Sequence, residues 1–181
     1  MNTPDTIVDP AVRLFRIPFD ALEALMAGDL DRASTTTGVP LPEAFITDEA
    51  ALWVWRYRRD QIIREPGSAP WLARAVVNEP DGTVVGNAGF HGGSDDVGVV
   101  EIGYTTLPDY RRRGYARAAV AAMLAEAAAS PDVRTVRASI CPDNVASLAL
   151  ARSFGFVQVG DQWDEEDGLE LVFERPAGGA A

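Results

Sequence analysis

Apolar and polar positions along the chain follow two periods, and each change of period predicts a new element of secondary structure. Alternation with a period of two, typical of strands, covers residues 11–18, 71–78, 83–90 and 97–106. Between the second and third of these segments, Pro80 and Asp81-Gly82 predict a tight turn. The first half of the chain is therefore expected to contain a β-hairpin.

Apolar residues at helical spacing predict four helices between these strands and after them. Their expected positions are 21–28 with Asp20 as cap, Thr47 to Pro66, 115–130, and 144–154 before Gly155. A further strand is predicted over 133–140, and a final pair of strands over 156–160 and 169–174.

This order of elements predicts a mixed α+β fold, with helices on the faces of one sheet. A chain of 181 residues fits one domain, which we expect over residues 1–175. The tail 176–181 is expected to be disordered, since it is rich in glycine and alanine.

Composition and charge narrow the classes of function. Hydrophobic residues make up 47% and charged residues 24%, as in ordinary globular proteins, and no apolar run is long enough to cross a bilayer. We therefore expect a cytoplasmic protein without a membrane partner. One cysteine and one histidine cannot supply a zinc cluster, so no metal is expected. The net charge of −11 argues against nucleic acid as a partner and favours cationic small molecules or peptides.

Three consecutive arginines interrupt this acidic chain in the stretch RRRGYA, residues 111–116. They precede Gly114 and the predicted start of a helix, where free N–H groups and the helix dipole attract anions. A pyrophosphate suits such a loop, and arginines add bidentate donors. The alternative is a solvated charge run. The stretch matches neither G-x-G-x-x-G nor a P-loop, so a nucleotide-binding protein of those types is disfavoured.

Two motifs in this order resemble a known family. The stretch 111–116 is similar to the R/Q-x-x-G-x-G/A loop of the GNAT superfamily of acetyl-CoA-dependent N-acetyltransferases, and EIGYTTLPDY leads into it. The run from Asn144 to Phe156 is similar to the N-x-x-S/A-x-x-L-x-x-x-G-F segment of that superfamily. The nearest resemblance is to ribosomal-protein alanine acetyltransferases, the RimJ/RimL-like type.

The resemblance implies a mostly antiparallel, twisted sheet of about seven strands with helices on both faces. The strands 97–106 and 133–140 are then expected to run parallel and splay apart, leaving a slot for the pantetheine arm of acetyl-CoA. A homodimer is also compatible with the resemblance.

The resemblance also implies where the co-substrate binds. The pantetheine arm is expected on the backbone of Tyr104, Thr105, Thr106 and Leu107. The pyrophosphate is expected on the loop formed by Arg111, Arg112, Arg113, Gly114, Tyr115 and Ala116. Asn144 and Ser147 are expected on the other side of the slot, although Asn144 also suits a helix N-cap and Ser147 the first helical turn.

For catalysis, Glu101 is the candidate general base, and the alternative is a carboxylate on a half-exposed strand. Many GNAT enzymes have a tyrosine that acts as the general acid where this chain has Ala151. Ser147 or a water is therefore expected to protonate the departing thiolate. Tyr104 and Tyr115 rank below Ser147 as acids, the first because it is expected in the core. His91 as a base, and Cys141 as a nucleophile, rank lower still.

Trp53 and Tyr57 lie four residues apart on one helix face, which favours core packing over an acceptor pocket. Arg56, Arg58 and Arg59 are expected on a solvated face of the same helix. The leading hypothesis is an N-acetyltransferase acting on a primary amine, either a protein N-terminus or a small amine. The alternative is a non-catalytic acyl-CoA-binding module of the same fold. The sequence leaves the acceptor open.

Overall fold

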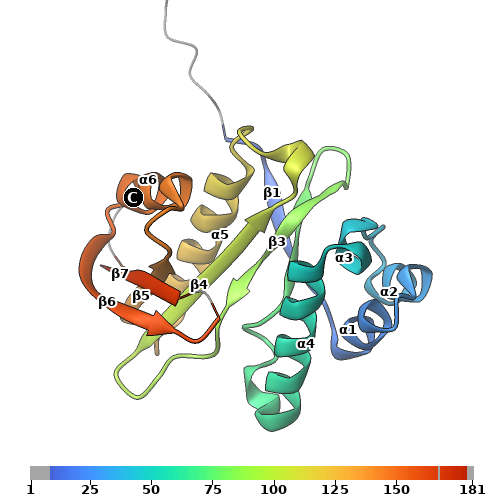
Figure 1. Cartoon of the computed structure of the whole chain (residues 1–181), viewed down its shortest axis with the longest axis horizontal. Coiled ribbons are helices and arrows are strands. Elements are labelled where there is room, and N and C mark those ends of the chain that lie inside the picture. The colour runs from blue at the N-terminus through green and yellow to red at the C-terminus, as the bar shows by residue number, and fades with distance from the viewer. Residues whose placement is uncertain (1–8, 167, 179–181) are drawn as a thin grey trace, which may run out of the picture.

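A seven-stranded sheet forms the centre of the computed structural model, which describes residues 9–166 and 168–178 (Figure 1). Its strands lie in the order β1-β2-β3-β4-β5-β7-β6, and every neighbouring pair is antiparallel except β4 and β5. The strands are β1 (Val12–Arg16), β2 (Arg74–Asn78), β3 (Val84–Phe90), β4 (Val99–Thr106), β5 (Thr135–Ile140), β6 (Val157–Asp164) and β7 (Gly168–Pro176). The expected fold class is confirmed.

Helices cover both faces of this sheet. They are α1 (Phe19–Met26), α2 (Leu30–Thr37), α3 (Ala44–Thr47), α4 (Glu49–Arg64), α5 (Tyr115–Ala129) and α6 (Val145–Ser153), with short 3-10 turns η1 (Pro66–Ser68) and η2 (Pro108–Tyr110). Figure 1 shows α1 to α4 grouped beside the β1–β4 half of the sheet, away from α6.

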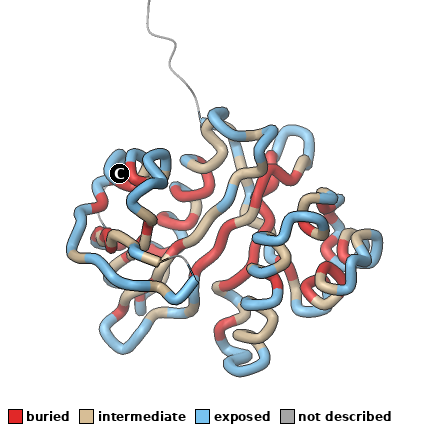
Figure 2. Tube along the Cα trace, viewed as in Figure 1, coloured by how far each residue is buried: buried red, intermediate tan, exposed pale blue. Residues whose placement is uncertain are grey.

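Alternation along β2 divides the interior into two cores. Ala75 and Val77 pack with the α1–α4 group, whereas Val76 belongs to the core beneath α5 and α6. Every position of β2 is therefore buried, because both faces of the strand are covered. Figure 2 shows the contrast with β6, the strand at the open edge, which is mostly exposed.

The parallel pair separates soon after it forms. Val99–Glu101 pair with Thr135–Arg137, and no pairing between β4 and β5 follows. The remaining five residues of β4 stay paired with β3 alone. The expected splayed pair is confirmed, and it opens the sheet at its middle.

Two helix starts differ from the sequence-based predictions, and two helices were not predicted. Helix α1 begins at Phe19 behind Pro18 with no side-chain cap, so Asp20 lies inside its first turn. Helix α4 is capped by Asp48, whose carboxylate accepts from the amides of Ala50 and Ala51, while Thr47 ends α3. Helices α2 and α3 were not predicted, because their apolar residues are too few for a periodic signal over one or two turns.

The ordered chain also continues past the predicted domain end. Pro176 still pairs with Thr135, and Ala177 is buried with its N–H donating to the Arg134 carbonyl at 2.8 Å. The expected tail 176–181 is thus wrong at its first two residues, because they bond to β5 and to the residue before it, and its last three lie outside the described residues.

Candidate active site

Two cavities meet on β4 where the sheet opens. The first, of about 640 Å³, lies between the β4–α5 loop and α6, and we call it the loop-side cavity. The second, of about 580 Å³, lies between α4 and the β6–β7 hairpin, and we call it the hairpin-side cavity. Tyr104 and Thr105 line both, so a group bound in one cavity can meet a group bound in the other at these residues.

The loop-side cavity begins at a strained turn. Arg112 has φ 61° and Gly114, the N-cap of α5, has φ 86°; Arg112 is the only non-glycine with positive φ among residues 9–166 and 168–178. The first N–H groups of α5, from Tyr115 on, have no carbonyl one turn earlier to bond. Together with the positive end of the helix dipole, they make this end of the cavity suited to an anion.

The arginines of the loop have different positions. Arg111 and Arg112 line the cavity, and Arg111 Nε donates to the Thr106 carbonyl at 3.1 Å. Arg113 is not in the lining, and its guanidinium lies 5.7 Å from the centre of the Tyr110 ring. Arg117, which sequence reasoning missed, lines the cavity one turn into α5, and its Nε donates to Asp9 at 3.0 Å.

The splayed edge of β4 exposes backbone groups to both cavities. Leu107 N–H donates to the Val85 carbonyl at 2.9 Å, and the Glu101 carbonyl accepts from His91 N–H at 2.8 Å, so odd-numbered positions of β4 bond to β3. Neighbouring residues of a strand point their backbone groups to opposite sides, and the backbone of Tyr104 therefore faces the opening. Within the expected segment Tyr104 to Leu107, the N–H of Leu107 is therefore already bonded to β3.

Asn144 and Ser147 are brought together at the start of α6, opposite this edge. The Asn144 carboxamide oxygen accepts from Ser147 N–H at 3.1 Å, so Asn144 caps the helix, and both residues line the loop-side cavity. Ser147 also hydrogen-bonds Tyr104 through its side chain. Burial raises the pKa of Tyr104 against the opposing effect of this bond, so its hydroxyl remains protonated at neutral pH.

Glu101 and His91 face each other in the hairpin-side cavity. His91 Nδ1 lies 3.6 Å from Glu101 Oε1, and the exposed fractions of the two side chains are 45% and 23%. The imidazole lies over Gly103, where an added Cβ would stand 2.6 Å from Nε2. Although 45% of this side chain is exposed, desolvation by the surrounding protein atoms and then the Arg58 guanidinium lower the pKa of His91 to about 4, so the ring is neutral at pH 7.

Comparison with known proteins agrees with this geometry. The family model described as "Acetyltransferase (GNAT) domain" matches residues 16–157. The chain belongs to the GNAT acetyltransferase family. Within this family it is 28% identical over 101 residues to the uncharacterized N-acetyltransferase YjdG of Bacillus subtilis, a match that spans 56% of this chain and 60% of that relative.

Solved GNAT structures share the fold. A putative ribosomal-protein-serine acetyltransferase from Vibrio cholerae is 22% identical, with a TM-score of 0.61 and coverage of 97% of this chain and 99% of its own. Mycobacterium smegmatis RimJ, solved in complex with CoA-disulfide, is 19% identical, with a TM-score of 0.63 and coverage of 92% and 82%. The expected resemblance to the RimJ/RimL type of GNAT protein is confirmed at the level of the fold.

One sequence-based prediction about α4 is wrong. Trp53 and Tyr57 do not pack in the core: they are 41% and 45% exposed, stack with ring centres 5.2 Å apart, and line the hairpin-side cavity. The core face of α4 is the one that carries the fully buried Trp55, whose indole N–H donates to the Phe45 carbonyl at 2.9 Å. Helical spacing places two residues on one face but does not say which face is covered.

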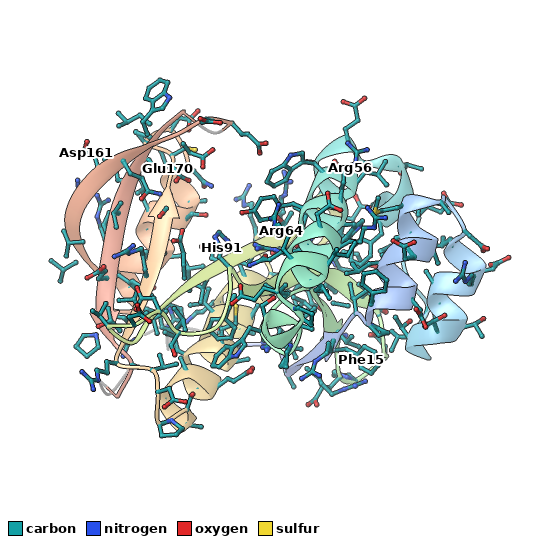
Figure 3. The ribbon with its side chains drawn as sticks, turned by 90° about the horizontal axis from the view of Figure 1, so that it is seen from below. Phe15, Arg56, Arg64, His91, Asp161 and Glu170 are labelled. Atoms are coloured by element: carbon teal, nitrogen blue, oxygen red, sulfur yellow. The ribbon has the colours of Figure 1, made fainter. Side chains whose placement is uncertain are left out.

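Two further residues of β4 and α4 line these cavities. Tyr104 is partly buried and packs against the core, as expected, and it also lines both cavities. Arg58 lines the hairpin-side cavity, while Arg56 is exposed. The β6–β7 hairpin contributes carboxylates that no motif had indicated (Figure 3, where Glu170 lies on the hairpin and His91 lies apart from it, toward the middle of the molecule). A pattern in the chain could not identify them, since the hairpin reaches the site from more than 50 residues away.

Two features are absent from the part of the chain that the structure describes. No three His, Cys, Asp or Glu side chains there are grouped so as to hold a metal ion. No helix in that part has the length and apolar character needed to cross a membrane.

Proposed function

We propose that this GNAT protein transfers an acetyl group from acetyl-CoA to a primary amine by direct attack, the amine being a small molecule or a protein N-terminus. The observation that carries the proposal is the meeting of the two cavities at Tyr104 and Thr105 on the open edge of β4. One cavity has the donors for a pyrophosphate, and the other has a carboxylate beside a neutral imidazole.

The acceptor must lose a proton before it attacks. An alkyl ammonium with a pKa of about 10.4 costs roughly 4.6 kcal/mol to deprotonate at pH 7. Glu101 is the proposed base, directly or through a water, and His91 is the group beside it that holds or passes on the proton. The neutral nitrogen then forms a bond to the thioester carbonyl carbon, whose oxygen becomes negative and accepts from Tyr104 N–H.

The nitrogen of this intermediate gives up its second proton to His91 or to solvent, and collapse breaks the carbon–sulfur bond and leaves an amide and the CoA thiolate. The thiolate takes up a proton, which restores the balance. Ala151 is buried and has no proton to donate at the position of the usual tyrosine. The Ser147 hydroxyl, supported by its hydrogen bond with the protonated Tyr104, is the proposed donor.

Glu101→Gln tests the proposal, because it keeps the shape of the side chain and removes its basicity. We expect kcat for amine acetylation to fall by about 100-fold or more, the usual contribution of a general base. The dissociation constant for acetyl-CoA, measured by calorimetry, is expected to stay within about twofold. Glu79→Gln, an exposed change outside both cavities, is the matched control.

The non-catalytic alternative predicts a different pattern. An acyl-CoA-binding module binds acetyl-CoA in wild type and in Glu101→Gln, and acetylates no amine in either. Wild type that binds no acetyl-CoA contradicts both hypotheses.

A further inference from the structure

The hairpin-side cavity carries more negative charge than a single reacting amine needs. Its lining has five carboxylates against one guanidinium, that of Arg58. Glu101 comes from β4, and the rest come from the β6–β7 hairpin: Asp164, Glu165, Glu166 and Glu170. A carboxylate near the reacting nitrogen raises its pKa and opposes its deprotonation, so the hairpin carboxylates do not help the nitrogen that attacks.

The aromatic pair on α4 faces the same space. Trp53 and Tyr57 expose large ring surfaces, with ring planes only 20° apart, and both line the cavity. Faces of Trp and Tyr rings attract cations. Tyr57 already has one at its ring, because the Arg58 guanidinium lies 5.2 Å from the ring centre.

A hydrogen bond joins the aromatic wall to the acidic wall. The Trp53 indole N–H donates to Glu166 Oε1 at 3.2 Å, across 113 positions of sequence. The indole face and the hairpin carboxylates therefore belong to one continuous surface that joins α4 to the hairpin. Figure 3 shows α4 and the hairpin with Glu170 on opposite sides of this space.

We infer that the acceptor is an aliphatic diamine or polyamine. Its reacting nitrogen meets Glu101 and His91 on the β4 side, and a second nitrogen, which stays protonated, binds the hairpin carboxylates beside the Trp53 ring. A slender chain with a charge at each end satisfies both parts of the cavity, which has room for it at about 580 Å³. The inference rests on the proposed function, since it concerns the acceptor of the same site.

The test compares acceptors that differ in their number of amino groups. With acetyl-CoA saturating, kcat/KM is measured for 1,5-diaminopentane, spermidine, 1-aminopentane and Ala-Ala amide. We expect kcat/KM for the diamine and for spermidine to exceed kcat/KM for the monoamine and the peptide by about tenfold or more, since one to two exposed ion pairs amount to roughly that factor. Equal use of monoamine and diamine, or preference for the peptide, overturns the inference while leaving acetyl transfer in place.

A charge-neutral variant locates the second nitrogen. In Glu165→Gln with Glu166→Gln we expect the ratio of the diamine and monoamine kcat/KM values to fall about tenfold, and spermidine binding by calorimetry to weaken similarly. Glu65→Gln with Glu79→Gln removes the same charge from exposed positions outside the cavity and should keep the wild-type ratio. If the ratio of the diamine and monoamine kcat/KM values is the same in both double variants, the inference is overturned. If no amine is acetylated at all, the inference and the proposed function are both overturned.

Discussion

At the scale of single residues, the site depends on groups whose charge is set by their neighbours. His91 and Glu101 are 3.6 Å apart, a distance at which a protonated imidazole would form an ion pair. Loss of water around the ring and the nearby Arg58 instead favour the neutral imidazole. A neutral His91 leaves Glu101 as the charged partner and keeps one ring nitrogen able to accept a proton during turnover.

The charge of His91 can be measured without assignment, because it is the only histidine in the chain. We expect the imidazole C2–H signal in NMR spectra of the untagged protein to titrate with a midpoint near pH 4, well below the usual 6.5. Arg58→Met removes a neighbouring positive charge and should raise the midpoint. Arg56→Met, an exposed change on the same helix, should leave it unchanged, and a wild-type midpoint near 6.5 contradicts the prediction.

The sign of the accompanying pH dependence follows from the lowered pKa. Between about pH 4 and 6.5 the unfolded chain binds a proton at this histidine and the folded chain does not. This group therefore makes the free energy of unfolding rise with pH across that window, and it adds no further pH dependence above about pH 6.5. The stability gained in this way is lost as the pH falls toward 4.

At the scale of elements, the β4–α5 loop contains two residues with positive φ, Arg112 and Gly114. Gly114 takes its positive φ without strain, whereas Arg112 carries a Cβ in the left-handed region. An added Cβ on Gly114 would also stand 2.8 Å from Pro10 Cδ. Strain of this kind is found where a backbone must present its donors to a ligand.

Substitutions at Arg112 separate strain from charge. Arg112→Ala and Arg112→Gly lose the same guanidinium and should weaken acetyl-CoA binding alike. A left-handed conformation destabilises the folded alanine variant by about 1–2 kcal/mol relative to glycine. The greater freedom of glycine in the unfolded chain destabilises the glycine variant by about 0.4–1 kcal/mol. We therefore expect the glycine variant to be more stable than the alanine variant by about 0.5–1 kcal/mol in urea unfolding.

Arg113 provides the control for this comparison. Its φ is not positive, so Arg113→Gly should be less stable than Arg113→Ala. The same order of stability at both positions would show that the φ of Arg112 carries no strain.

At the scale of the whole molecule, the site exists because two parts of one sheet diverge. Three paired residues connect β4 to β5, and beyond them the α1–α4 side and the β6–β7 hairpin face each other across the hairpin-side cavity. Charge is distributed over this molecule with 27 acidic and 16 basic residues, a net charge of −11. Repulsion among the negative charges destabilises the folded state, and the same negative charge attracts cations to the protein.

Added salt should therefore stabilise the protein. Raising NaCl from 10 to 150 mM shortens the screening length from about 30 Å to about 8 Å. If this relieves roughly 1 kcal/mol of repulsion, the thermal midpoint rises by about 2–4 °C for a chain of this size. Scanning calorimetry at NaCl concentrations from about 10 to 150 mM measures this midpoint. A midpoint that falls with salt would mean that surface ion pairs outweigh the repulsion.

Local patterns by themselves determined most of the elements. Alternation and turn residues predicted the β2–β3 hairpin, and a glycine before a long apolar-faced helix predicted the start of α5 at Tyr115. Such features depend on residues a few positions apart, which is the range over which periodicity, caps and turns act. The RimJ/RimL-like motifs then implied the splayed strand pair.

Tertiary structure alone decided which residues share the cavities. Trp53 and Tyr57 were predicted in the core, but α1 and α3 cover the opposite face of their helix and leave the pair open. The hairpin carboxylates face α4 only because β7 inserts between β5 and β6 in the sheet. Contacts between distant segments depend on strand order and on which face is covered, and neither is encoded in the period of a local pattern.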